Sequence, residues 1–208
     1  MTMNLYQKYP VLAACRAEIE AAKDLLIAAY TAGHKVLTCG NGGSAADAEH
    51  IVGELMKGFL RTRPLDAAAR AALTTAGGAD GAYMAEHLQT PLPAVSLVSS
   101  VALATAFAND VAPELVFAQQ VMGLGQPGDV LLGISTSGNS KNVLYALIAA
   151  RARGLKTLGL GGGTGGRMPA LCDVCITMPA PQTHEIQELH VPVYHYLCAE
   201  VERHFFAV

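Results

Sequence analysis

Val130-Leu131-Leu132-Gly133-Ile134 is an uninterrupted apolar run, and Ser135-Thr136-Ser137-Gly138-Asn139-Ser140 follows it directly. The run is typical of a buried strand, and the pattern from Lys141 to Leu147 is helical. A strand therefore ends in four hydroxyl side chains and a glycine, where a helix begins. Free N–H groups at a helix start favour an anion without lysine or arginine. An N-cap and a turn would use similar residues, but four hydroxyls within six positions favour a phosphate site.

The rest of the chain repeats this strand–helix step. We predict strands at residues 36–39, 94–98, 130–134, 157–160 and 174–178. We predict helices at residues 11–32, 44–56, 101–108, 113–124, 139–153 and 183–206. Short apolar strands alternating with helices indicate the α/β class, with a parallel sheet covered on both faces. The prediction is a three-layer sandwich with a five-stranded parallel sheet and long first and last helices.

Two polar, glycine-rich turns follow predicted strands, at residues 40–44 and 135–140. In open α/β sheets, ligands bind at the carboxyl ends of the strands, near the topological switch point. We therefore expect both turns at the binding edge. A third glycine-rich segment, Gly161 to Gly166, lacks the lysine and spacing of a P-loop, so we expect a flexible connection there.

Residues 65–92 interrupt the pattern. Asp66 to Leu73 could form a short helix, and Gly77 to Gly81 a turn. The segment exceeds an ordinary strand–helix connection, which favours a lid or an interface arm. A tolerated surface insertion fits the sequence equally well.

Composition limits the other possibilities. A chain of 208 residues is expected to form a single domain, residues 1–208, with an insertion at about 65–92. No window resembles a membrane span, and Met1 to Lys8 lacks the layout of a signal peptide. We therefore expect a soluble cytoplasmic protein without a membrane partner. The net charge of −3 argues against a nucleic-acid partner.

Two spaced pairs of side chains are candidate metal ligands. His50 and Glu54 stand four apart on the predicted second helix and share a face. Gln187 and His195 stand eight apart on the last helix, again near one face. Imidazole and carboxylate are ordinary zinc ligands, whereas a glutamine oxygen is rarer. Spacing alone favours a surface His–Glu pair over a metal site. His190 lies on another side of its helix, so we expect it to be a packing or interface residue and not a ligand.

Several of these segments together resemble the sugar isomerase (SIS) domain family, and within it the sedoheptulose 7-phosphate isomerases. The resemblance is carried by Cys39-Gly40-Asn41-Gly42-Gly43-Ser44-Ala45-Ala46-Asp47-Ala48-Glu49-His50, Asn109-Asp110, Gly128 to Asn139, and Ile186-Gln187-Glu188-Leu189-His190. It covers nearly the whole chain except residues 65–92. It also implies a flavodoxin-like strand order.

The resemblance implies a role for each matching position. Residues matching His50, Glu54, Gln187 and His195 hold one zinc ion per subunit. Residues matching Ser135, Thr136, Ser137 and Ser140 hold the sugar phosphate. Residues matching Asn41, Gly42, Gly43, Ser44, Asn109, Asp110 and Gln187 contact the sugar. The family is typically a homotetramer, with sites built at subunit interfaces.

The implied reaction is aldose–ketose isomerisation of sedoheptulose 7-phosphate to D-glycero-D-manno-heptose 7-phosphate through an enediol, a step toward lipopolysaccharide heptose. Glu54 would be the base and His195 the acid, with zinc polarising the substrate oxygens.

Two alternatives stay open. A non-catalytic SIS protein could bind a phosphosugar or a replication-initiation protein, but it would have no reason to keep the full acid, base and metal set. An isomerase for a different phosphosugar would share the fold and the phosphate site. The segment 65–92, and Glu185 where the family suggests a basic residue, could both alter the sugar preference.

Overall fold

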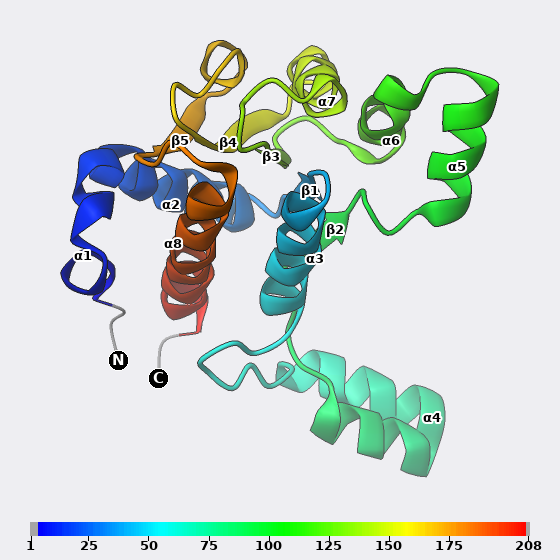
Figure 1. The fold of residues 1–208 in the computed structure, drawn as a ribbon. Helices are drawn as coiled ribbons and strands as arrows, with labels where there is room; N and C mark the ends of the chain where they lie inside the picture. Colours follow the sequence, from blue (N-terminus) through cyan, green and yellow to red (C-terminus); the bar gives the residue numbers. More distant parts are fainter. Residues whose placement is uncertain (1–3, 207–208) are drawn as a thin grey trace.

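Five parallel strands form the centre of the computed structural model, which describes residues 4–206 (Figure 1). The strands are β1 (Val36–Cys39), β2 (Ala94–Ser96), β3 (Val130–Ile134), β4 (Lys156–Gly162) and β5 (Val174–Met178). Their order is β2-β1-β3-β4-β5, and every neighbouring pair is parallel. The predicted five-stranded parallel sheet with flavodoxin-like order is confirmed.

Helices cover both faces of the sheet. One layer contains α2 (Arg16–Thr31), α3 (Gly43–Met56) and α8 (Thr183–Phe205), and the other contains α6 (Val116–Leu124) and α7 (Lys141–Ala152). Successive strand residues point to opposite faces, so Leu132 joins the first hydrophobic cluster and Leu131 joins the second. Each face therefore has its own core, and the three-layer prediction is confirmed.

The first predicted helix is interrupted. The sequence pattern predicts one helix over residues 11–32, but the chain forms α1 (Leu5–Lys8), a 3₁₀ helix η1 (Pro10–Cys15) and then α2. Proline at the first position of η1 favours a new helical start, and Cys15 has non-helical angles (φ −118°, ψ 25°) that separate η1 from α2. The last predicted helix agrees with α8 to within one residue.

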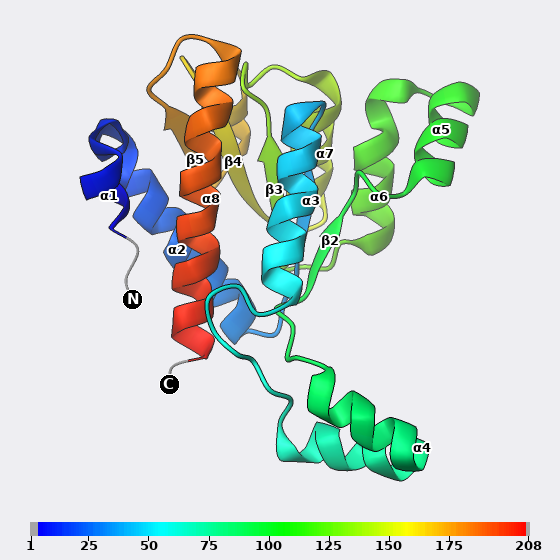
Figure 2. The same ribbon diagram turned by 60° about the horizontal axis from the view of Figure 1, so that its bottom comes forward.

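The segment after α3 forms a helical hairpin, α4 (Ala67–His87). Asp66 caps its start by accepting a hydrogen bond from the N–H of Ala69 at 2.7 Å. Gly78 (φ 54°, ψ −122°) breaks the helix, so the predicted helix and turn are present, but the chain then resumes a second helical arm. The arms pack so closely that a Cβ on Gly81 would lie 2.0 Å from the Leu73 carbonyl oxygen. The hairpin projects away from the sheet in both views (Figures 1 and 2).

The rest of the chain between β2 and β3 forms α5 (Val101–Asp110) and the 3₁₀ helix η2 (Pro113–Leu115) before α6. A third 3₁₀ helix, η3 (Met168–Leu171), precedes β5. Within the described residues, no helix is long and apolar enough to cross a membrane.

The strand order places the switch point between β1 and β3. These strands are direct neighbours, with Cys39 opposite Gly133, and the helices that follow them cover opposite faces. The turns after β1 and β3 therefore lie side by side at the carboxyl edge, where α/β sheets bind ligands.

Candidate active site

The turn after β1 is compact because glycines allow close backbone approach. Gly42 has a φ of +57° at the start of α3, a conformation that favours glycine. A Cβ on Gly40 would lie 2.4 Å from the Ser44 carbonyl oxygen. The N–H of Ser44 donates to the Asn41 carbonyl at 3.1 Å and its side chain is buried. The glycines of this turn thus leave the backbone at the start of α3 uncovered by side chains of their own.

The serine-rich loop after β3 is organised from within. The hydroxyls of Ser135 and Ser140 lie 2.9 Å apart, and the Ser137 hydroxyl accepts from the N–H of Asn139 at 3.2 Å. In the described part of the chain, no hydrogen bond uses the N–H of Thr136 or Ser137. No side chain caps the start of α7. These free donors are what an anion at a helix start needs.

The segment after β4 supports this loop. We expected Gly161 to Gly166 to be a flexible connection, but Gly161 and Gly162 belong to β4 and the rest packs on the serine loop. A Cβ on Gly138 (φ +63°) would lie 1.8 Å from the Gly165 carbonyl oxygen, and the N–H of Arg167 donates to the Gly138 carbonyl at 3.1 Å. Close backbone packing therefore fixes the shape of the candidate phosphate loop.

Asn142, which sequence reasoning missed, joins the two loops. Its amide nitrogen donates to the Asn41 oxygen at 2.8 Å, and the Asn41 nitrogen donates back at 2.9 Å. Residue 142 follows the serine loop by two positions, and its amide side chain was the available signal. The structure thus brings Asn41, Gly42, Gly43 and Ser44 beside Ser135, Thr136, Ser137 and Ser140, as the strand pattern predicted.

Three of the candidate metal ligands meet between α3 and α8. His50 Nε2 lies 3.1 Å from Glu54 Oε1 and 3.5 Å from His195 Nε2. The two helices lie side by side in both views (Figures 1 and 2). Burial, and then the neighbouring His50, hold the pKa of His195 below its usual value. A lowered pKa favours the neutral ring, which has a lone pair that can bind a metal ion or a proton.

These distances suit a tetrahedral metal ion. Ligand atoms at 2.0–2.1 Å from zinc stand about 3.3 Å from one another, close to the separations at His50. Within residues 4–206, no three or more His, Cys, Asp or Glu side chains are grouped so that they could hold a metal ion as they stand. The pairwise distances and the donor chemistry therefore carry the fit. Glu54 also accepts from Lys57 Nζ at 3.1 Å, which is the ordinary surface pairing.

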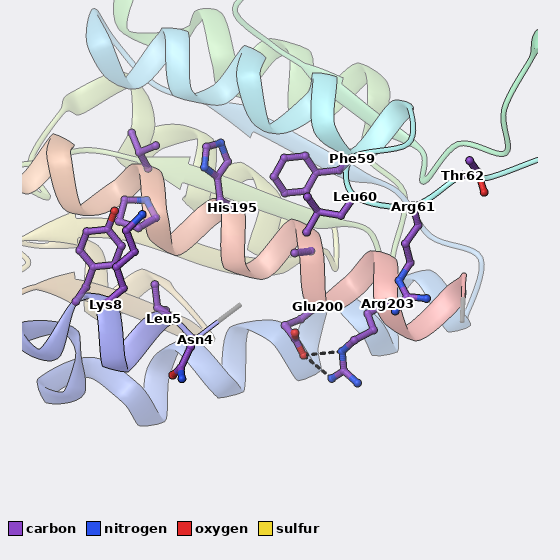
Figure 3. A pocket seen from close by; sticks show the side chains of 14 residues that line it. Asn4, Leu5, Lys8, Phe59, Leu60, Arg61, Thr62, His195, Glu200 and Arg203 are labelled. Atoms are coloured by element: carbon purple, nitrogen blue, oxygen red, sulfur yellow. Dashed lines mark hydrogen bonds and ion pairs between the residues drawn. The ribbon is translucent and has the colours of Figure 1, made fainter. Parts of the chain in front are cut away.

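A groove of about 1040 Å³ opens beside His195 (Figure 3). It lies between α1, the residues that follow α3, and α8. The Phe59 ring lies 5.4 Å from the His195 ring, centroid to centroid. Basic side chains surround the groove; they are Lys8, Arg61 and Arg203, the last paired with Glu200. His195 thus links the candidate metal ligands on one side to this groove on the other.

Three further predicted residues lie elsewhere. Gln187 packs against Gly43, since a Cβ on that glycine would lie 2.6 Å from Gln187 Nε2. Gly43 is seven residues before His50 on α3, so Gln187 lies beside the turns that follow β1 and β3 and not beside His50. Asn109 and Asp110 are exposed at the end of α5, and in the described structure their side chains hydrogen-bond only each other, at 2.8 Å. The expectation that they line the same pocket stays a prediction.

Two other residues from the sequence analysis make defined contacts. His190 is fully buried and its Nε2 lies 3.2 Å from the Gly161 carbonyl oxygen, which confirms a packing role. Glu185, which departs from the family pattern, accepts from the N–H of Gln182 at 3.2 Å and so stabilises the start of α8.

Known proteins with similar sequences and structures identify the family of this chain. The SIS domain family matches residues 10–89 and 85–162. The chain is 43% identical over 190 residues to a phosphoheptose isomerase of Nitratiruptor, covering 91% of this chain and 88% of that protein. It is 41% identical over 188 residues to a phosphoheptose isomerase of Rhodospirillum rubrum, covering 90% and 86%. The solved structure of a phosphoheptose isomerase from Francisella tularensis superposes with a TM-score of 0.78 at 31% identity, covering 94% and 91%. The chain belongs to the SIS domain family and, within it, to the phosphoheptose isomerases.

Proposed function

We propose that this protein interconverts sedoheptulose 7-phosphate and D-glycero-D-manno-heptose 7-phosphate. The observation that carries the proposal is the meeting of His50, Glu54 and His195 from two helices, on the same subunit as a hydroxyl-rich anion loop at the switch point. A pure interaction protein needs no such set of acid, base and ligand groups.

The distance between the two halves of the site supports a long substrate. Gly43, beside the phosphate loop, and His50 are seven residues apart on α3, or roughly 10 Å along the helix axis. An extended seven-carbon sugar phosphate spans such a gap, whereas a triose phosphate does not. Gln187 lies at the loop end of this span, where its amide would contact sugar hydroxyls.

The reaction needs two proton movements. Glu54 takes a proton from C1 of the ketose and returns it to C2. His195 gives a proton to the carbonyl oxygen and recovers one from the C1 hydroxyl. The phosphate loop would hold the far end of the substrate, so that binding energy remote from C1 and C2 fixes their position.

The proposed metal is one zinc ion per subunit, held by His50, Glu54 and His195. When bound, zinc would supply a Lewis acid for the substrate oxygens. Gln187, the fourth proposed ligand, would have to turn its amide along α8 to join them. The two distances from His50 Nε2, to Glu54 and to His195, support the set. Glu54 would also have to leave the metal when it acts as the base.

We further propose a homotetramer in the cytoplasm, where sugar phosphates are made. Exposed apolar side chains support an oligomer: Tyr83 on α4 is 64% exposed and Val101 on α5 is 68% exposed, and none of the α5 residues is buried. Exposed apolar patches can mark interaction surfaces, and α4 and α5 each carry more than one exposed large apolar side chain. Light scattering after size-exclusion chromatography would give the subunit number.

The test of the activity uses zinc-loaded protein with sedoheptulose 7-phosphate in D₂O, followed by proton NMR. We expect heptose 7-phosphate with deuterium incorporation, and loss of both with Glu54→Gln. Glu49→Gln is the matched control, because it removes another carboxylate of α3. The Glu49 carboxylate accepts from the Ser99 hydroxyl at 2.8 Å and lies outside the proposed acid, base and ligand set.

The outcomes separate the possibilities. Deuterium exchange without the aldose would assign the same chemistry to another phosphosugar. If zinc is bound and neither exchange nor turnover occurs, the isomerase proposal is refuted and a binding protein is favoured. Equal loss with Glu49→Gln and Glu54→Gln would remove the assignment of Glu54 as the base.

A further inference from the structure

Tyr194 connects the candidate metal site to a carboxylate behind it. Its hydroxyl lies 2.9 Å from His50 Nδ1 and 3.4 Å from Asp47 Oδ1. Tyr194 is on α8, directly before His195, and is only 2% exposed. Asp47 and His50 are three residues apart on α3 and share a face. The three side chains form a continuous chain of contacts.

The donors and acceptors of this chain are determined by the chemistry of its members. A tyrosine hydroxyl has an ordinary pKa of about 10 and keeps its proton at neutral pH. A carboxylate accepts hydrogen bonds and cannot donate. With its proton donated to Asp47, the Tyr194 hydroxyl is free to accept from an Nδ1–H of His50, and this is the arrangement in which both contacts are hydrogen bonds.

The buried His190 also approaches Asp47. The Nε2 of His190 faces the Gly161 carbonyl at 3.2 Å, so it carries a proton, and its Nδ1 stands 3.9 Å from Asp47 Oδ2. This nitrogen has no hydrogen-bond partner within the described residues. His190 contacts the second carboxylate oxygen and does not compete for the one that faces Tyr194.

The tautomer of His50 follows. A neutral imidazole with its proton on Nδ1 has its lone pair on Nε2, and His50 Nε2 is the atom that faces Glu54 Oε1 and His195 Nε2. Histidines that bind metals commonly donate their other N–H to a carboxylate, a carbonyl or water. Here a tyrosine hydroxyl stands between the histidine and the carboxylate.

We propose that Tyr194 and Asp47 are positioning residues that hold His50 with its proton on Nδ1 and its Nε2 lone pair directed at a divalent cation. This inference rests on the metal site of the proposed function and adds the two residues that orient it. It does not depend on which sugar is the substrate.

The experiment measures zinc affinity by competition with a chromogenic chelator, without substrate. Tyr194→Phe should weaken zinc binding 10–100-fold, the usual effect of losing an outer hydrogen-bond partner. Tyr196→Phe is the matched control: its hydroxyl, on the same helix, donates to Glu20 Oε1 at 2.8 Å, away from His50. We expect that control to change zinc affinity less than about threefold. ¹⁵N NMR of the zinc-loaded protein should show the His50 proton on Nδ1.

A double-mutant cycle tests the chain itself. Asp47→Asn should also weaken zinc binding, and adding it to Tyr194→Phe should have much less than the additive effect, because both changes interrupt one chain. Equal affinities for Tyr194→Phe and the unmodified protein would overturn the proposal, as would equal losses in both tyrosine variants. Absence of zinc binding in the unmodified protein would overturn it too.

The two proposals fail in different ways. If zinc affinity responds to Tyr194 but sedoheptulose 7-phosphate is not converted, the isomerase assignment fails and the positioning role stands. If the sugar phosphate is converted and Tyr194→Phe leaves the zinc affinity unchanged, only the positioning role fails.

Discussion

Replacing Glu202 by Gln would leave a buried cation without its carboxylate. The side chains of Glu202 and Arg63 have no solvent exposure, and Arg63 Nε donates to Glu202 Oε1 at 2.8 Å. Glu202 also accepts from the N–H groups of Phe59 and Leu60, each at 2.7 Å. Arg63 donates to the Leu55 carbonyl at 2.6 Å. This pair therefore ties the residues after α3 to α8.

The expected loss is large because desolvation of Arg63 is no longer compensated. Removing one partner of a buried ion pair costs about 3–5 kcal/mol, a large part of the roughly 5–15 kcal/mol that stabilises a typical domain. At about 2–4 °C per kcal/mol for a chain of this size, Tm should fall by roughly 6–20 °C.

The assay is thermal unfolding followed by circular dichroism, at one protein concentration so that any oligomer contributes equally. Glu200→Gln is the matched control, since Glu200 lies two residues earlier on α8 and pairs with the half-exposed Arg203. A pair of that kind contributes about 0–1 kcal/mol. Arg63→Met combined with Glu202→Leu should recover part of the loss. A Tm change no larger than that of Glu200→Gln would refute the reasoning.

Three other changes have defined outcomes. Gly138→Ala places a Cβ 1.8 Å from the Gly165 carbonyl oxygen, whereas the control Gly33→Ala changes a glycine of similar φ (+80°) with open space around it. Only Gly138→Ala should weaken the binding of inorganic phosphate, at least tenfold by calorimetry. Equal effects of the two changes would contradict the loop assignment. Burial alone would raise the pKa of Asp129, but hydrogen bonds from Lys35 and the Gln126 N–H hold it below its usual value. A carboxyl with a lowered pKa stabilises the fold at pH values above its pKa in the unfolded chain, about 3.9, and this stabilisation is lost as the pH falls. Asp129→Asn should therefore lower Tm at pH 7 and reduce the fall in Tm between pH 5 and pH 3. An undiminished fall in Tm would exclude this role of Asp129. Replacing residues 66–88 by a short glycine-serine linker should shift Tm by less than about 5 °C. The two ends of this segment are already held together by the bridge between Pro64 and Gln89 and by the Thr90 N–H, which donates to the Arg63 carbonyl at 2.7 Å. An unfolded product would show that α4 belongs to the core.

Much of the fold was predictable because its signals are local. The apolar run Val130 to Ile134 is buried at every position, and such runs form strands covered on both faces. A polar turn after each of β1 and β3 then has to lie at the carboxyl edge of a parallel sheet. His50 and Glu54 share a helix face by spacing alone. These conclusions need only the chain's periodicity and the geometry of helices and strands.

The breaks in helices were less visible. The apolar pattern of residues 11–32 continues across Cys15, so periodicity could not reveal the change from η1 to α2. In α4, the glycines marked the bend, but the second arm consists of alanine-rich sequence with little amphipathic pattern, because most of it contacts solvent.

The sequence by itself predicted the α/β class and the place of the two glycine-rich turns at the carboxyl edge of the sheet. Its resemblance to the SIS family implied the strand order and the candidate acid, base and ligands. Only the tertiary structure decided which of those side chains meet: His195 joins His50 across 145 positions, Gln187 stays with the loops, and Asn109 with Asp110 stands apart. It alone revealed Asn142, Tyr194 and the Arg63–Glu202 pair. The physical reason is that a hydrogen bond between residues far apart in the chain depends on how two helices pack, and neither helix carries that distance in its own periodicity.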